Sequence, residues 1–173
     1  KKISLKEDFS IDPTDYFNAD GMVVIANPNA PTGIALTIEE IEKIVSANPD
    51  NLVVIDEAYV DFGGESAISL IDKYDNLLVT QTFSKSRSMA GARLGFGIAS
   101  PALIADLHTV RYSTNPYNIN RMTMAAGIGT LKDKAYTDKC CKTVIANREY
   151  LQNELTALQF EYLPSSANFV FAK

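Results

Sequence analysis

The chain has 173 residues, of which 46% are hydrophobic and 21% are charged, a balance typical of a globular protein with a sizeable apolar core. The formal net charge is −5 and the sequence pI is about 4.9, which argues against a nucleic-acid-binding protein because such proteins carry a basic surface. Apolar runs such as residues 22–26 are too short to cross a bilayer, so we expect no membrane partner.

Short apolar stretches predict the strands of one sheet: residues 23–26, 52–55, 77–80 and 94–99. The last strand is predicted to be antiparallel, because the connection before it is too short for a crossover helix. After the first strand comes a turn rich in proline and glycine over residues 27–33. Strands that alternate with amphipathic helices indicate an α/β fold with a mostly parallel sheet.

Helices are predicted from both capping residues and apolar spacing. Thr37 and Glu40 have the spacing of a capping box, so a helix is expected to begin at residue 37. Ser100 followed by Pro101 is the order preferred at a helix N-terminus. The sequence Asn-Pro-Tyr-Asn at residues 115–118 is expected to end that helix, and another follows from about residue 120.

A long helix is predicted over residues 133 to about 158, and its length suggests a connector between two domains. Cys140 and Cys141 are adjacent and read as helix-packing residues, which favours a reducing, cytoplasmic setting. The segments 160–163 and 168–172 look like strands.

The order of these elements predicts two domains. Residues 1–132 are expected to be a large domain that is incomplete at its N-terminus. Residues 133–173 are expected to be the connecting helix and the start of a truncated small domain. The absence of an initial Met suggests a piece of a longer chain.

Polar side chains follow the first three predicted strands: Asn27, then Asp56 and Tyr59, then Thr82, Ser84 and Lys85. The carboxyl ends of parallel strands meet in a crevice where ligands bind. A lysine amine there can bond covalently to a carbonyl carbon, and an acid can keep a pyridine nitrogen protonated. Hydroxyl groups together with Arg93 suit a phosphate. The residues alone therefore predict a site with an amine, an acid and a phosphate-type cluster.

The ordered motifs resemble those of the fold-type I aminotransferases that depend on pyridoxal 5'-phosphate (PLP). The matching segments are residues 27–33, 56–59, 84–85 and 93–95. Within that family, residues 56–62 and 82–93 look most like the histidinol-phosphate aminotransferases. The resemblance implies a three-layer αβα large domain with a mostly parallel sheet, one antiparallel strand and the start of a small α/β domain.

The resemblance also implies a role for each candidate residue. Lys85 would bond covalently to PLP and move a proton between the substrate and the cofactor. Asp56 would pair with the pyridine nitrogen, and Asn27 and Tyr59 would hydrogen-bond the 3-oxygen of the ring.

For the phosphate group, the resemblance implies binding by Thr82, Ser84 and Arg93. A Gly-rich segment before this chain and an arginine after it would complete the cofactor and substrate sites.

The implied reaction is ping-pong transamination between an amino donor such as glutamate and a keto acceptor such as imidazole-acetol phosphate, catalysed by a homodimer. An aminotransferase for aromatic amino acids or a decarboxylase of phosphate-containing amino acids would share every motif. A non-catalytic PLP-fold domain of a regulator is an alternative of another class, although the acidic composition gives it no support. An accidental match of the motifs in an unrelated α/β domain is the remaining alternative.

Overall fold

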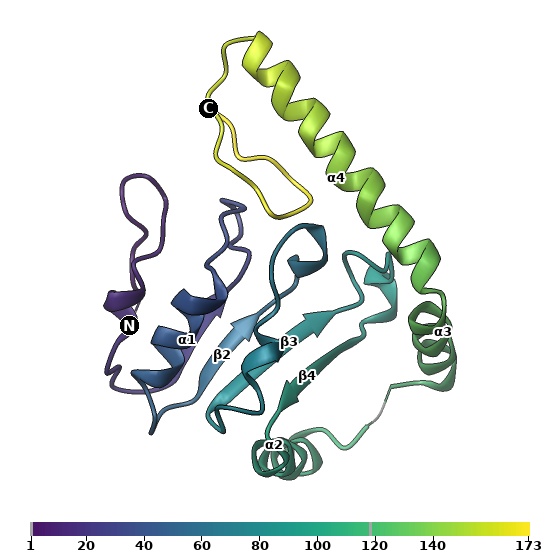
Figure 1. Ribbon diagram of the computed structural model, residues 1–173. Coiled ribbons are helices and arrows are strands. Elements are labelled where there is room, and N and C mark those ends of the chain that lie inside the picture. The colour runs from purple at the N-terminus through teal and green to yellow at the C-terminus, as the bar shows by residue number, and fades with distance from the viewer. Residues whose placement is uncertain (1, 118) are drawn as a thin grey trace.

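The computed structural model describes residues 2–117 and 119–173, and within them the strands form one four-stranded sheet (Figure 1). The strands lie in the order β1 (Val23–Ala26), β2 (Val53–Asp56), β3 (Leu77–Thr82) and β4 (Gly95–Ala99). β1, β2 and β3 are parallel, and β4 is antiparallel to β3. The predicted mixed α/β sheet is therefore confirmed, although β2 starts one residue later than predicted and β3 extends two residues further.

One face of the sheet is covered, and it holds the core of the protein. Alternate residues of β1, β2 and β3 point to this face and are buried: Val23, Ile25, Val53, Ile55, Leu77 and Val79. They pack against α1 (Ile38–Ser46), whose Ile41 and Ile44 are fully buried. The capping box predicted for this helix is present, since Thr37 Oγ1 accepts from Glu40 N and Glu40 Oε2 accepts from Thr37 N.

The opposite face of the sheet is open around β1 and at Asp56 and Gly97 in the part of the chain that the structure describes, although Leu78 of β3 is buried there. Val24 is 57% exposed there, and Asp56 and Gly97 are exposed on the neighbouring strands. The described residues therefore form a sheet with a helical layer on one face.

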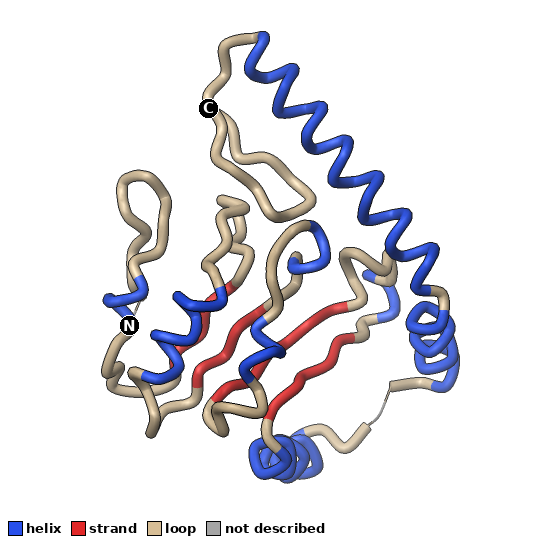
Figure 2. The backbone as a smooth tube through the Cα atoms, viewed as in Figure 1, coloured by secondary structure: helices blue, strands red, loops and turns tan. Residues whose placement is uncertain are grey.

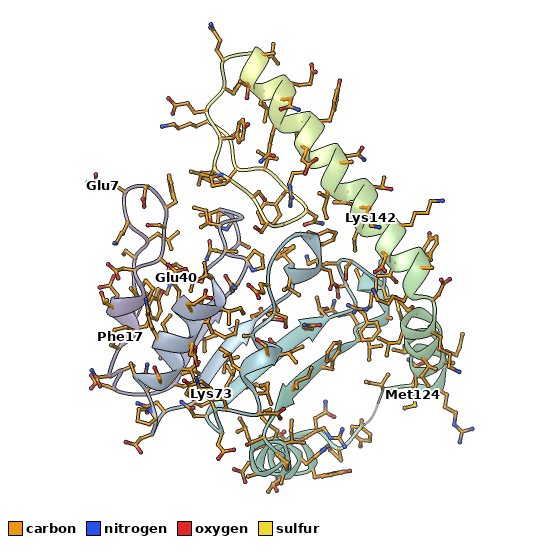
Figure 3. The ribbon with its side chains drawn as sticks, viewed as in Figure 1. Glu7, Phe17, Glu40, Lys73, Met124 and Lys142 are labelled. Carbon is orange, nitrogen blue, oxygen red and sulfur yellow. The ribbon has the colours of Figure 1, made fainter. Side chains whose placement is uncertain are left out.

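Three helices follow the sheet: α2 (Pro101–Thr114), α3 (Arg121–Lys132) and α4 (Lys134–Ala157). Ser100 is the N-cap of α2, as predicted, and α4 crosses the molecule as a single long rod (Figure 1). α2 buries none of its residues, and its apolar Val110 is 58% exposed. Met124 lies on the exposed side of α3, at the margin of the molecule (Figure 3). Of the predicted break at residues 115–118, Asn118 lies outside the described residues.

The last part of the chain, residues 160–173, is named here the C-terminal hairpin. The prediction of two strands in it is wrong, because it contains one isolated antiparallel bridge, Tyr162 with Ala172, and is otherwise loop (Figure 2). A two-stranded ribbon with no third strand beside it has little to hold a longer ladder. The hairpin reaches back to the turn that follows β1, where Ser166 N donates to Gly33 O at 2.8 Å.

Within residues 2–117 and 119–173, each helix is too short or too polar to span a bilayer.

Replacing Gly33 with alanine is expected to lower the free energy of unfolding by about 2 kcal/mol. Gly33 has φ +81°, and a Cβ atom added there would clash with Ser165 Oγ and lie 2.8 Å from Ser165 Cβ. The substitution would therefore strain the backbone and push the C-terminal hairpin away from the 27–33 turn. Urea denaturation of the variant measures the effect. Gly21→Ala is the matched control, because a Cβ atom at Gly21 meets nothing within 4 Å.

Candidate functional site

The residues predicted to form a site lie at one edge of the sheet. Asn27 follows β1, Asp56 ends β2, and Thr82 ends β3. Because β4 is antiparallel, its first residue, Gly95, pairs with Thr82, and Arg93 just before it lies at the same edge. The ends of the parallel strands and the start of the antiparallel strand lie together at one end of the sheet (Figure 1), and the seven candidates are on these strand ends or in the connections that follow them.

Lys85 and Tyr59 contact each other, although they come from different connections. Lys85 Nζ lies 5.1 Å from the centroid of the Tyr59 ring. That ring also packs edge-to-face with Phe169 of the C-terminal hairpin, with centroids 5.2 Å apart and planes at 86°. Lys85 is exposed and forms no ion pair with any residue in the described part of the chain. Its amine is therefore available to react.

Asp56 carries an exposed carboxylate on the open face of the sheet. Its only side-chain partner among the described residues is Thr80, whose hydroxyl donates to Oδ1 at a long 3.4 Å. The carboxylate is consequently free to bind a cationic group from a ligand.

Asn27 lies beside Asp56 and is joined to it by a backbone hydrogen bond of 2.9 Å. It is 1% exposed, and its side chain pairs with the backbone of Leu36, accepting from N at 2.7 Å and donating to O at 3.3 Å. The side chain thus fixes the 27–36 turn. A second N–H of its amide is left for another acceptor.

The phosphate-type cluster is only partly assembled. Thr82 Oγ1 accepts from Ser84 N at 3.1 Å and donates to Leu94 O at 3.4 Å. Arg93 donates from Nη1 to Ala90 O at 3.2 Å and forms no ion pair with any residue that the structure describes. Its φ of +53° is uncommon for a residue other than glycine, and such strain gathers at functional sites. None of the contacts of the described residues joins its guanidinium to Thr82 or Ser84.

An ion-pair cluster fixes the loop that carries Lys85. Asp61 accepts hydrogen bonds from Ser86 Oγ and from Arg87 Nη1, the second at 3.0 Å. The Arg87 guanidinium also lies 5.3 Å from the Phe83 ring centroid. Since Asp61 belongs to the loop after β2, these contacts couple the loop of Lys85 to the loop of Tyr59.

Three residues that contribute to the site were missed by sequence reasoning. Glu57 is a buried carboxylate next to Asp56, and the two-residue period of β2 places it on the covered face of the sheet, which was a usable signal. Phe169 packs on Tyr59. Arg148 of α4 donates to Phe62 O at 2.9 Å and to Ala167 O at 2.6 Å, and no sequence signal indicated this.

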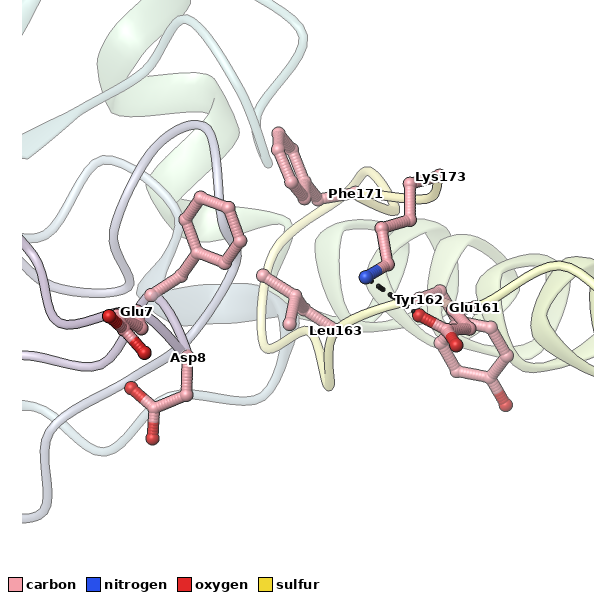
Figure 4. Close-up of a pocket in the computed structure, with 8 residues that line it drawn as sticks. Glu7, Asp8, Glu161, Tyr162, Leu163, Phe171 and Lys173 are labelled. Atoms are coloured by element: carbon pink, nitrogen blue, oxygen red, sulfur yellow. Dashed lines mark ion pairs between the residues drawn. The ribbon is translucent and has the colours of Figure 1, made fainter.

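A hollow of about 190 Å³ lies elsewhere, between the N-terminal segment and the C-terminal hairpin (Figure 4). Glu7, Leu163 and Phe171 are among its lining residues, and none of the predicted site residues is. Within the described residues, no group of three or more His, Cys, Asp and Glu side chains could hold a metal ion.

Comparison with known proteins shows similarity to aminotransferases. Over 172 residues the chain is 56% identical to the histidinol-phosphate aminotransferase of Acinetobacter baumannii (strain ATCC 17978), a match that covers 99% of this chain and 48% of that protein. The histidinol-phosphate aminotransferase from Clostridium acetobutylicum has a similar structure, with a TM-score of 0.86 and 30% identity, over 96% of this chain and 52% of that one.

The histidinol-phosphate aminotransferase from Sinorhizobium meliloti, solved in complex with pyridoxal-5'-phosphate, matches with a TM-score of 0.78 and 28% identity, over 86% of this chain and 41% of that one. The chain thus spans about half the length of the proteins that it matches, 48% in the Acinetobacter case. The family model of aminotransferases of class I and II matches residues 2–173. The chain belongs to the family of class I and II aminotransferases.

Proposed function

We propose that this chain is part of a PLP-dependent histidinol-phosphate aminotransferase. The observation that carries the proposal is the free amine of Lys85 over the Tyr59 ring, at the same sheet edge as the free carboxylate of Asp56. The 56% identity to an enzyme of that name supports the choice of substrate. Because the match covers 48% of that enzyme, the activity belongs to a longer protein.

The groups at the sheet edge suit PLP chemically. When bound, PLP supplies an aldehyde that condenses with amines and a pyridine ring that accepts electrons. Lys85 offers the amine for covalent attachment and, once released, a base for the proton of the substrate α-carbon. Asp56 offers the negative charge that holds a proton on the pyridine nitrogen.

Tyr59 and Asn27 would hydrogen-bond the 3-oxygen of the ring, Asn27 through its second amide N–H. Arg93 would bind the phosphate, because a guanidinium with no acidic partner matches a phosphate dianion. Thr82 and Ser84 would contribute hydroxyl groups to the same phosphate.

The open face of the sheet and the exposed helices lead to proposals about the rest of the protein. We propose that residues 1–132 belong to a three-layer αβα large domain, whose remaining segments cover the face that carries Val24. Residues 133–173 would be the connecting helix and the start of the small domain. The exposed apolar side chains of α2 and α3, such as Val110 and Met124, support a homodimer.

The complete reaction would be ping-pong. An amino group would pass from glutamate to the cofactor and then to imidazole-acetol phosphate, and the reverse direction would use the same groups. The substrates would be small molecules of the cytoplasm.

The substrate assignment is tested with the full-length protein, PLP and 2-oxoglutarate. We expect amino transfer from histidinol phosphate with a kcat/KM at least about 100-fold above that for phenylalanine, since a site built for a polar group discriminates strongly against analogues that lack it. The measurement is glutamate formation with each donor. A preference for phenylalanine would replace the proposal with an aromatic aminotransferase, and release of CO₂ from added phosphoserine would replace it with a decarboxylase of phosphate-containing amino acids.

A further inference from the structure

Glu57 is a carboxylate at the centre of a buried hydrogen-bond network, and the role proposed above for its neighbours does not use it. It is 1% exposed. Its Oε1 accepts from Ala67 N at 2.6 Å, and its Oε2 accepts from Ser66 Oγ at 2.7 Å and Gln81 Nε2 at 2.8 Å. A buried carboxylate is tolerated when donors surround it in this way.

The network joins the two strand ends that carry the reactive groups. Glu57 directly follows Asp56, the last residue of β2. Gln81 lies on β3, four residues before Lys85. Glu57 N also donates to Thr80 O at 2.8 Å, which continues the pairing of the two strands beyond Asp56. The Gln81 side chain adds a second, side-chain link at the same level of the sheet.

Glu57 cannot act directly on a ligand of Asp56. Successive residues of a strand point to opposite faces, so Asp56 faces the open side of the sheet while Glu57 is buried on the covered side. Burial raises the pKa of Glu57, and the hydrogen bonds from Ser66, Gln81 and Ala67 oppose that rise. Its carboxylate therefore acts as the hydrogen-bond acceptor for Ser66, Ala67 and Gln81 and does not face a ligand.

We infer that Glu57 is a positioning residue, which fixes the end of β2 with Asp56 against the end of β3 that leads to Lys85. The inference rests on the proposed function, because it takes these two residues to act on the same cofactor. A small displacement of either strand end would misplace a charge or an amine relative to the other, and catalysis is sensitive to such displacements.

The test exchanges the donor and the acceptor of the Glu57–Gln81 pair in the full-length protein. Gln81→Glu places two carboxylates at a distance suited to one hydrogen bond, where both cannot be ionised without repulsion. The double variant Glu57→Gln with Gln81→Glu restores one amide and one carboxylate, and Gln at 57 can still accept from Ala67 N. Thr37→Ala is the control for stability alone, because the cap of α1 lies outside the network.

We expect Gln81→Glu to lower kcat about 100-fold, and the double variant to return it to within about fivefold of the unchanged protein. The pH midpoint of the visible absorption band of bound PLP should move in the single variant and return in the double one. Thr37→Ala should lower the melting temperature by a few degrees, roughly the effect of losing a helix cap, with kcat and the band unchanged. All rates are measured well below the melting temperatures.

The outcomes separate the inference from the proposed function. A Gln81→Glu variant that melts earlier but keeps its kcat and absorption band would overturn the positioning role and leave the function intact. Failure of the double variant to recover either readout would also overturn that role. If borohydride traps no PLP on Lys85 of the unchanged protein, the proposed function fails, and the role of Glu57 fails with it.

Discussion

Lys85→Ala is expected to abolish the covalent attachment of PLP and to lower kcat by at least about 10⁴-fold, the upper range for loss of a general acid–base group. The structure leaves this amine unpaired by any acid among the described residues and exposed at the edge of the sheet. Alanine has neither the nucleophile nor the base. Reduction with borohydride followed by peptide mass spectrometry locates the attachment.

The fold should survive this change. The Lys85 side chain contacts the Tyr59 ring and is exposed, so its loss removes no part of the core. Lys73→Ala is a matched control, because Lys73 is paired with Glu42 on the covered side of the sheet and should leave labelling unchanged. A phosphopyridoxyl group found on another lysine of the unchanged protein would contradict the assignment.

Asp56→Asn should lower the rate of amino transfer by about three orders of magnitude, equivalent to about 4 kcal/mol of transition-state free energy. The substitution keeps the shape of the side chain and removes the negative charge that would hold a proton on the pyridine nitrogen. Single-turnover rates at saturating histidinol phosphate measure the effect on chemistry, while fluorescence titration reports PLP binding.

The control for charge is Asp50→Asn, which makes the same change in the turn that precedes the same strand and is also exposed. It should leave the rate within about twofold, as is usual for surface substitutions. Unimpaired transfer in Asp56→Asn would remove Asp56 from the cofactor site.

Local signals made much of the fold predictable from the sequence. The capping box of Thr37 and Glu40 needs only four consecutive residues, and the structure contains it. The end of β3 was not predictable in the same way. Gln81 and Thr82 are polar, yet they continue the strand because their backbone pairs with Phe96 and Gly95 of β4.

In the candidate site, too, residues marked by local sequence signals could be predicted, whereas residues that depend on long-range contacts could not. Asp56 could be placed because it stands where a buried strand ends, and the order of the strands then brings it to the edge reached by Lys85. Arg148 could not be placed, because it contacts Phe62, which is 86 residues away in sequence. A structural role of Asn27 in its turn could be expected from the neighbouring prolines, but its pairing with Leu36 could not, since that depends on how the turn folds.

The antiparallel direction of β4 has a mechanical consequence. Lys85 and Arg93 stand at the two ends of one hairpin connection, which the pairing of Thr82 with Gly95 closes at its base. The spacing between the backbone positions of these two residues is therefore limited by one short loop and its closing pair. Movements of α4 or of the C-terminal hairpin would carry Tyr59 and its neighbours without stretching that spacing. The backbone positions of Lys85 and Arg93 are thus fixed relative to each other independently of the segments that hold Tyr59.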